Sequence, residues 1–166
     1  MATRFWVRVA REHLVFCAGH FISYAGDQCE RLHGHNYRVS VEAEGPLDEN
    51  RYVVDFIALK KIVRQVTEPL DHRMLLPAHN AHIVVQTGPT SVEVTYRDRR
   101  WIFPAEDCVI LPVANTTAEE LARYLAGQIR QRLIAETTFR PGRLRVEVEE
   151  APGQSACYEE QDDSVR

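Results

Sequence analysis

Three of the histidines are placed so that their imidazoles could bind one metal ion. His20 ends a run of strand-forming residues, and His33 and His35 stand two residues apart where a second strand begins. Residues i and i+2 of a strand project from the same face, so His33 and His35 can converge on one ion while Gly34 leaves the opposite face uncrowded. If the two strands pair as a hairpin, His20 can reach the same point. Three neutral imidazoles leave the fourth position of a tetrahedral zinc ion open, which is the pattern of a catalytic site.

A thiol and a carboxylate–imidazole pair add proton-transfer chemistry. Cys29 stands four residues before His33, in a loop expected to lie over the open side of the ion, and a thiol beside a cation loses its proton more easily. Asp71 precedes His72 just after a predicted helix, and a carboxylate beside an imidazole fixes its tautomer and strengthens it as a base. Each motif alone is short, and an Asp–His pair is usually only a surface ion pair. Together they favour a zinc-dependent enzyme.

Alternating apolar residues predict the strands that carry these groups. Residues 4–17 mix β-branched and aromatic residues on both parities, which indicates a long strand with both faces partly covered. Residues 35–43 alternate more cleanly. A later strand is expected at residues 144–148, and a short one around residues 157–158.

Two amphipathic helices are expected between these pairs of strands. The first begins near Asp55 and ends at Pro69, and the second begins after Thr116 or Thr117, either of which can cap it. Strands that precede and follow the helices, rather than alternate with them, indicate an α+β fold: a four-stranded antiparallel sheet with two helices on one face. We expect a single domain over residues 1–166.

Residues 78–114 are predicted to form an insertion. Strand-forming residues separated by turn signals indicate an extra β-hairpin or a small meander rather than a second domain. It carries Arg97, Arg99 and Arg100 beside Trp101, and the aromatic residue favours packing over ligand stacking. The insertion could cover the site, change the substrate, or extend a subunit contact.

Composition excludes several other classes of protein. The chain has 166 residues and a formal net charge of −4, and it lacks the basic balance that nucleic-acid partners select. No stretch approaches the roughly eighteen uncharged apolar residues of a membrane span, so we expect neither nucleic acid nor a membrane as partner. The N-terminal residues do not form a signal peptide, and the four cysteines are far apart without a CxxC pair. We expect a cytoplasmic protein with free thiols.

Six segments together resemble a known family in order and spacing. The strings FCAGH, CERLHGHNY, VVDFIALK, PLDHRML, NTTAEELA and VEVEEAPGQSACY are similar to the 6-pyruvoyl-tetrahydropterin synthase family, and within it to the bacterial 6-carboxy-tetrahydropterin synthase branch. The resemblance covers most of the chain outside the insertion. It implies the T-fold, or tunnelling fold, whose strands join across subunits, typically in a homohexamer of two trimers with active sites at subunit interfaces.

The resemblance also implies a role for each matching residue. Zinc would be held by His20, His33 and His35. Cys29 would be the catalytic base, with Asp71 and His72 as a proton relay. The pterin substrate would be bound by Glu150, which accepts hydrogen bonds from its amide and amine, and by Thr117 and Glu119.

The implied reaction has one close alternative and one distant one. The resemblance implies conversion of 7,8-dihydroneopterin triphosphate to 6-carboxy-tetrahydropterin, with release of acetaldehyde and triphosphate. The close alternative is a 6-pyruvoyl-tetrahydropterin synthase, which eliminates triphosphate without cutting the side chain. The distant one is a pterin-binding homologue without catalysis. Three positions depart from the family pattern: Cys17 replaces a serine, Phe21 a frequent Arg or Lys, and Ala118 a frequent Ser or Thr.

Overall fold

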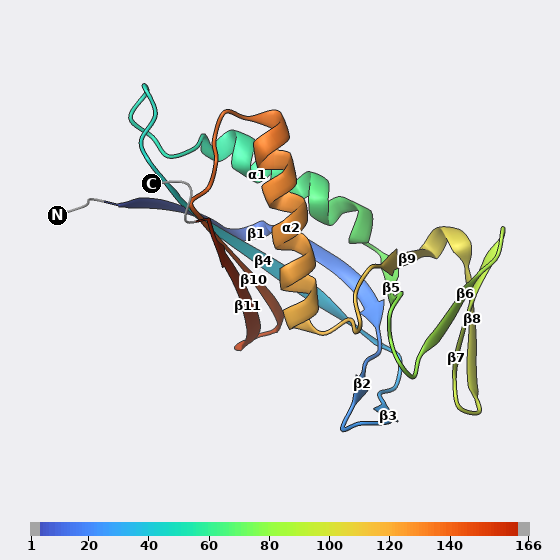
Figure 1. Ribbon diagram of the computed structural model, residues 1–166. Helices are drawn as coiled ribbons and strands as arrows, with labels where there is room; N and C mark the ends of the chain where they lie inside the picture. Colours follow the sequence, from blue (N-terminus) through green and yellow to red (C-terminus); the bar gives the residue numbers. More distant parts are fainter. Residues whose placement is uncertain (1–3, 163–166) are drawn as a thin grey trace.

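The computed structural model describes residues 4–162, except for the side chains of residues 11–13. Two helices pack on one face of a mixed β-sheet (Figure 1), which confirms the predicted α+β class. Two 3-10 helices and five further short strands, in a two-stranded and a three-stranded sheet, connect and flank these layers. The elements in chain order are β1 (Phe5–His20), β2 (Ser23–Tyr24), β3 (Gln28–Cys29), β4 (His33–Gly45), α1 (Phe56–Thr67), η1 (Glu68–Leu70), β5 (Arg73–Pro77), β6 (Val84–Thr87), β7 (Ser91–Tyr96), β8 (Arg99–Pro104), η2 (Ala105–Asp107), β9 (Cys108–Leu111), α2 (Ala118–Glu136), β10 (Arg143–Ala151) and β11 (Gln154–Gln161).

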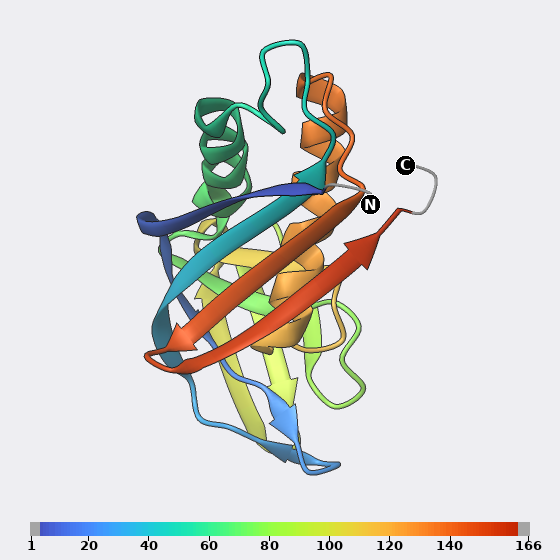
Figure 2. The same cartoon turned by 90° about the vertical axis from the view of Figure 1, so that its left-hand side faces the viewer.

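The main sheet has the order β11-β10-β4-β1-β5-β9. The first four of these strands are antiparallel, as the sequence predicts, and they cross in front of the helices in Figure 2. The structure adds two short parallel strands, because β5 pairs with the end of β1 and β9 pairs with β5. Both added strands come from segments whose apolar runs are too short to show a period, so their pairing follows from tertiary contact.

A register shift explains the mixed parity of the first strand. In β1, Val9 faces the core before the shift, and Leu14 and Phe16 face it afterwards. The pairing with β4 shifts between Ala10 and Val15, so the inward-facing parity changes along the strand. This irregularity, rather than two covered faces, is why apolar residues occupy both parities.

Both helices begin at the caps that the sequence offers. The Asp55 side chain accepts a hydrogen bond from the Ile57 backbone N–H at 2.9 Å, and Thr117 accepts one from Glu120 at 3.4 Å. Of the two candidate caps of α2, the structure therefore selects Thr117. The apolar stripes of α1 and α2 pack with the sheet into the main core. Capping and burial together hold the helices against the strands that carry the histidines.

The insertion forms a small three-stranded antiparallel sheet in the order β6-β7-β8, the meander that the sequence allowed. It has a core of its own with Val92, Val94 and Tyr96, which also takes in Met74 and Leu76 of β5. Leu75, between them, faces the main core instead. Strand β5 is therefore buried on both faces, and it connects the insertion to the main sheet.

Close packing at Gly34 generates the first testable prediction. Gly34 lies opposite Gly19, and a Cβ on Gly34 would approach the Ala18 carbonyl oxygen to 3.1 Å. We expect Gly34→Val to lower the free energy of unfolding by about 1–3 kcal/mol, because a branched side chain must displace backbone. Urea denaturation followed by circular dichroism measures this change.

Gly127 provides the matched control. It lies inside α2, and a Cβ there meets no atom within 4 Å. Gly127→Ala should raise the free energy of unfolding by about 0.5–1 kcal/mol, since alanine loses less backbone entropy in a helix. Equal stability of Gly34→Val and the parent chain would contradict the close approach of β1 and β4.

Candidate metal centre and catalytic site

The pairing of β1 with β4 assembles the histidine triad. His20 lies directly opposite His33, and Ala18 lies opposite His35, so the three imidazoles share one face at the end of the hairpin. The alanine methyl leaves space that a larger cross-strand partner would fill. The ring centroids are separated by 4.7 Å for His20 and His33, and by 4.8 Å for His33 and His35. The predicted convergence of the three histidines is present.

The donor atoms of the triad fit a metal ion. One ligand atom from each histidine lies within 4.8 Å of the others. The Nε2 atoms of His20 and His35 are buried and have no hydrogen-bond partner. Such orphaned acceptors are costly unless a ligand uses them, and a cation bound by three imidazoles would do so. Within the described residues, this is the group whose side chains and geometry suit a metal.

Backbone carbonyls orient two of the three rings. His20 Nδ1 lies 2.9 Å from the Thr116 carbonyl oxygen, and His33 Nδ1 lies 2.8 Å from that of Arg31. A carbonyl only accepts, so each Nδ1 carries the proton and each Nε2 keeps its lone pair for a metal. Burial lowers the pKa of His20, which favours the neutral, ligating form.

Glu150 reaches the triad from β10. Its Oε1 atom lies 3.1 Å from His20 Nε2 and 3.3 Å from His35 Nε2, but neither contact has hydrogen-bond geometry. The Tyr37 hydroxyl donates to the same oxygen at 3.4 Å. Burial, followed by the Glu150 charge, raises the pKa of Tyr37, so this phenol remains a donor. The carboxylate predicted to bind substrate is thus held at the open side of the triad.

Cys29 ends a small hairpin formed by β2 and β3, which follows the triad residue His20. Its thiol is half-buried and donates to the Glu30 carbonyl oxygen at 3.5 Å. Glu30 also contacts the triad, because its Oε2 atom lies 3.9 Å from His33 Nε2. Burial raises the pKa of Cys29, and the nearby Arg99 guanidinium opposes that rise. The net effect of these protein groups is a raised pKa of Cys29. They do not provide the lowered pKa that was expected for a thiol beside a cation.

The Asp71–His72 pair is formed, but it lies apart from the other groups. His72 Nδ1 is 3.0 Å from Asp71 Oδ2, and Asp71 Oδ1 accepts the Cys17 backbone N–H at 2.8 Å. That backbone hydrogen bond is the main reason the pKa of Asp71 is lowered. His72 is 81% exposed and has a φ of 56°. Among the described residues, no hydrogen bond, ion pair or ring contact joins this pair to Cys29 or to the triad.

The backbone of His72 is held in a strained conformation with a positive φ. A positive φ costs a non-glycine residue about 1–2 kcal/mol. The His72 N–H donates to the Cys17 carbonyl oxygen at 2.6 Å, and the Cys17 N–H donates to the Asp71 carboxylate. Cys17 of β1 therefore holds both residues of the turn. Strain of this kind persists where the surroundings determine it, and it is frequent at functional sites.

The two other predicted substrate-binding residues lie at the start of α2. Thr117 uses its hydroxyl to cap the helix, and Glu119 is exposed in the first turn. Their neighbour Thr116 is fully buried, and its carbonyl orients His20. Asn115 donates to the Ser23 carbonyl oxygen at 2.7 Å, which attaches the β2 segment to the same turn.

Two of these functional contacts were not assigned from the sequence. The Thr116 contact with His20 involves a backbone carbonyl, which leaves no signal in the residue type. Arg99 donates to the backbone at Cys29 and Glu30. The cluster of basic residues beside Trp101 was a signal for the insertion, but only the fold shows which of them reaches the cysteine.

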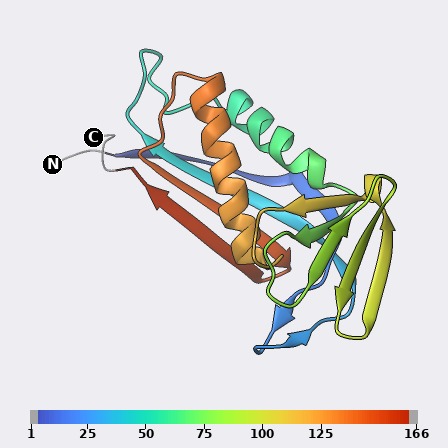
Figure 3. The ribbon, with the colours of Figure 1, turned by 45° about the vertical axis from the view of Figure 1, so that its right-hand side comes forward.

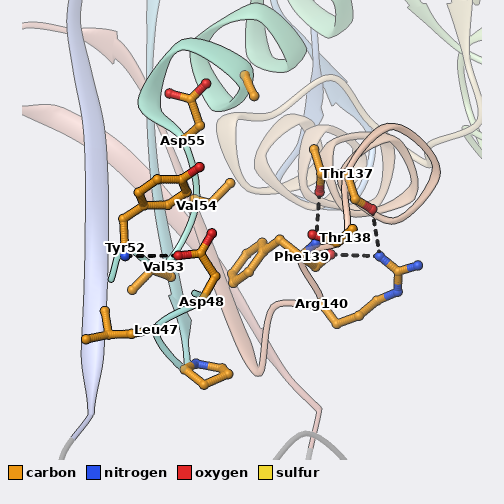
Figure 4. A pocket seen from close by; sticks show the side chains of 12 residues that line it. Leu47, Asp48, Tyr52, Val53, Val54, Asp55, Thr137, Thr138, Phe139 and Arg140 are labelled. Carbon is orange, nitrogen blue, oxygen red and sulfur yellow. Dashed lines mark hydrogen bonds between the residues drawn. The ribbon is translucent and has the colours of Figure 1, made fainter. Parts of the chain in front are cut away.

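A separate pocket lies at the opposite end of the sheet, between the turn before α1 and the segment after α2. It has a volume of about 300 Å³ and is shown in Figure 4. In Figure 4 Asp48 lies beside the Phe139 ring, whereas the Arg140 guanidinium turns toward Thr137; Asp48 and Arg140 both make hydrogen bonds within their own loops. None of the predicted metal-binding, catalytic or substrate-binding residues lines it. The candidate site is therefore the histidine triad and its surroundings.

Comparisons with known proteins identify the family of this chain. The family model described as 6-pyruvoyl tetrahydropterin synthase matches residues 9–161. A putative 6-carboxy-5,6,7,8-tetrahydropterin synthase of Methanocaldococcus jannaschii is 33% identical over 153 residues, which cover 92% of this chain and 89% of that protein. The corresponding enzyme of Haemophilus influenzae is 27% identical over 126 residues, covering 69% of this chain and 77% of that protein.

A solved structure gives the same fold along the whole chain. The 6-pyruvoyltetrahydropterin synthase of Plasmodium vivax superposes with a TM-score of 0.90 at 30% identity, covering 97% of this chain and 100% of that one. This likeness confirms the predicted T-fold. It also extends over the insertion, which is therefore part of the shared architecture.

The triad yields a prediction on metal binding. His33→Ala should weaken binding of Zn²⁺ at least ~100-fold, because loss of a ligand costs more than the 10–100-fold typical of losing an outer partner. Isothermal titration of the metal-free protein measures the affinity. His82→Ala is the control, since His82 is exposed before β6 and its backbone alone bonds to Asn80. Equal affinity in both variants would refute the triad as the metal site.

Proposed function

Because this chain belongs to the 6-pyruvoyl tetrahydropterin synthase family, whose members are lyases of tetrahydropterin biosynthesis, we propose that it is a zinc-dependent 6-carboxy-tetrahydropterin synthase. The substrates are 7,8-dihydroneopterin triphosphate and one water, and the products are 6-carboxy-5,6,7,8-tetrahydropterin, acetaldehyde and triphosphate. The observation that carries the proposal is the convergence of three imidazoles, whose donor atoms lie within 4.8 Å of one another, with the Glu150 carboxylate against two of them.

The metal is held by His20, His33 and His35 through their Nε2 atoms. A set of three neutral imidazoles with an open position is typical of catalytic zinc. When bound, zinc supplies Lewis acidity that polarises side-chain oxygens of the substrate and acidifies the adjacent C–H. The carbonyls of Thr116 and Arg31 keep two of these rings in the ligating tautomer.

Proton transfer is assigned to Cys29, Asp71 and His72. The Cys29 thiolate is the general base that removes a proton from the side chain of the substrate. Asp71 holds His72 Nδ1, which leaves Nε2 of an exposed ring free to deliver or accept a proton. The cysteine and the dyad lie on different segments, so they can act on neighbouring carbons.

Substrate binding is assigned to Glu150, Thr117 and Glu119. The Glu150 carboxylate accepts hydrogen bonds from the amide and the exocyclic amine of the pterin. Tyr37 supports this role, because its donor holds one carboxylate oxygen while the other stays available. Ala118 removes one hydroxyl that relatives often offer, at a cost on the order of 1 kcal/mol in affinity.

Two free sheet edges support the proposed homohexamer of two trimers. Strand β11 is terminal in the sheet, and in the described part of the chain residues 5–16 of β1 pair only with β4. Long unpaired edges are usually covered, and pairing β1 of one copy with β11 of the next closes the sheet into a ring. The separation of Asp71–His72 from Cys29 is explained if a neighbouring subunit supplies the dyad.

The proposed compartment is the cytoplasm. All four cysteines are free thiols, as expected in a reducing environment. Among the described helices, none combines the length and the apolar content that crossing a bilayer requires.

The deciding experiment is a single-turnover reaction of zinc-loaded protein with 7,8-dihydroneopterin triphosphate. Mass spectrometry identifies the pterin product, and a coupled assay detects acetaldehyde. Carboxy-tetrahydropterin with one equivalent of acetaldehyde supports the proposal. A pyruvoyl product without acetaldehyde would replace it by the 6-pyruvoyl reaction, which the likeness to the Plasmodium vivax enzyme favours as the second candidate. Tight pterin binding with unchanged substrate would indicate a non-catalytic homologue.

The role of Cys29 predicts a loss of turnover without a loss of metal. Cys29→Ala should reduce kcat by about 100-fold or more, the range typical of removing a general base. Its zinc content, measured by elemental analysis, should remain that of the parent. Cys157→Ala is the control, because Cys157 is exposed on β11. Normal turnover by Cys29→Ala would assign the base to another group.

A shared site predicts complementation between two inactive variants. Cys29→Ala and His72→Ala, denatured together and refolded as mixed oligomers, should regain activity in about a quarter of their sites if adjacent subunits supply the two groups. Steady-state turnover of the mixture measures this gain, and each variant refolded alone is the control. A mixture no more active than its parts would show that one subunit supplies both groups.

A further inference from the structure

The insertion packs against the segment that carries Cys29. Phe21, directly after the triad residue His20, stacks on Trp101 of β8 with ring centroids 4.6 Å apart. Cys29 itself packs at the edge of the insertion core. In Figure 3 the sheet formed by β6, β7 and β8 stands beside the hairpin of β2 and β3. The aromatic residue at position 21, a departure from the family pattern, is therefore a partner of the insertion.

Arg99 makes a double contact with the backbone of the cysteine. Its Nη2 donates to the Cys29 carbonyl oxygen at 2.8 Å, and its Nη1 donates to the Glu30 carbonyl oxygen at 3.1 Å. Two parallel hydrogen bonds from a planar guanidinium fix both position and orientation. Arg99 thus spans the peptide that follows the thiol-bearing residue.

The guanidinium of Arg99 is itself held on two sides. It lies over the rings of Tyr96 at 5.0 Å and Trp101 at 5.1 Å from the ring centroids. These cation–π contacts limit the rotation of a side chain that otherwise has many rotamers. Because the Arg99 guanidinium is fixed, the position of β8 determines the position of the Cys29 backbone.

The other end of the hairpin is fixed in the same way. The Tyr96 hydroxyl donates to the Asp27 carbonyl oxygen, and the Arg97 guanidinium forms an ion pair with the Asp27 carboxylate. Tyr96 ends β7, and Arg97 begins the turn between β7 and β8. The insertion therefore holds the Cys29 hairpin at its tip and at its end.

The charges around the thiol give Arg99 a second effect. Burial disfavours the thiolate, and Glu30, the other charged neighbour that shifts the pKa of Cys29, disfavours it too. Arg99 is the cation that opposes both. Its positive charge lowers the pKa of Cys29, and its Nη1 shares the Glu30 carbonyl oxygen with the thiol as a hydrogen-bond acceptor.

We propose that Arg99 is a positioning residue for the base, and that the insertion exists in part to present it: the guanidinium holds the Cys29–Glu30 peptide so that the thiol faces the substrate on the triad. This inference rests on the proposed function, in which Cys29 is the general base. It gives the insertion a role beyond the three that the sequence left open, since the inserted sheet acts on the site through the loop that bears the cysteine.

The test measures the thiol directly, without substrate. Zinc-loaded protein is alkylated with iodoacetamide from pH 6 to pH 10, and the modified Cys29 peptide is quantified by mass spectrometry. Arg99→Gln should raise the pKa of the alkylation profile and slow alkylation at pH 7 by about tenfold, the change in thiolate fraction for one pKa unit. Arg100→Gln is the matched control, because Arg100 is exposed and bonds to Glu93 within the insertion.

Activity gives the second readout. We expect Arg99→Gln to lower kcat by about 10–100-fold with a smaller change in KM, since misplacement of a reacting group acts on the chemical step. Arg99→Lys keeps the charge but not the double hydrogen bond, so it should recover the alkylation profile more than kcat. Zinc content and melting temperature should match those of Arg100→Gln.

Each outcome decides the inference separately from the proposed function. An unchanged alkylation profile and kcat in Arg99→Gln overturn the positioning role. If that variant fails to fold, Arg99→Lys decides, and parental kcat there overturns it as well. A shifted profile in Arg99→Gln together with normal turnover by Cys29→Ala would remove the base role of Cys29, and with it the proposed positioning of a base.

Discussion

The cross-strand register of β1 and β4 is the constraint on which the site depends. His20 and His33 are direct partners, and His35 faces the small side chain of Ala18. Because strand side chains alternate, a slip of one residue would turn two of the imidazoles to the opposite face. Gly34 tightens this register, since its missing side chain lets β4 approach the Ala18 carbonyl. The convergence of the three imidazoles is thus set by the backbone pairing of the two strands.

Two apolar cores meet at the strand that links the site to the insertion. Leu75 of β5 faces the main core, and Leu76 faces the core of the insertion. The dyad of Asp71 and His72 precedes this strand and is held by the backbone of Cys17. Because β5 is packed on both faces, it connects the Asp71–His72 turn rigidly to the inserted sheet. The insertion is consequently placed to influence catalysis without contributing a reacting group.

The polar face of the sheet balances its own charges. Away from the helices, Arg8 lies near both Glu42 and Glu147, and Arg145 lies near Glu42. Such exposed pairs contribute little to stability singly, but they keep a strand face soluble when its edges are free. The arrangement suits a sheet whose polar face lines the inside of a ring of subunits, as proposed for the oligomer.

The sequence alone determined the antiparallel strands of the main sheet, both helices and the candidate metal ligands. The HxH spacing, the alternation of residues 35–43 and the helical caps depend on local geometry, so they predict the triad, the antiparallel strands and both helices without tertiary information. The resemblance of whole segments then identified the family. These features lie within a few residues of one another along the chain, or repeat with a fixed period.

Only the tertiary structure decided which distant groups meet. The carbonyl of Thr116 on His20, the Tyr37 hydroxyl on Glu150 and the guanidinium of Arg99 on the Cys29 peptide join positions far apart in the chain. The parallel strands β5 and β9 also depend on such contacts, because their apolar runs are too short to carry a period. A backbone carbonyl is present in every residue, so the sequence does not show which one accepts a hydrogen bond. The sequence pattern around a surface arginine likewise does not show which group it contacts. For these reasons the sequence was enough to predict the three candidate metal ligands, whereas the groups that orient them could be identified only from the fold.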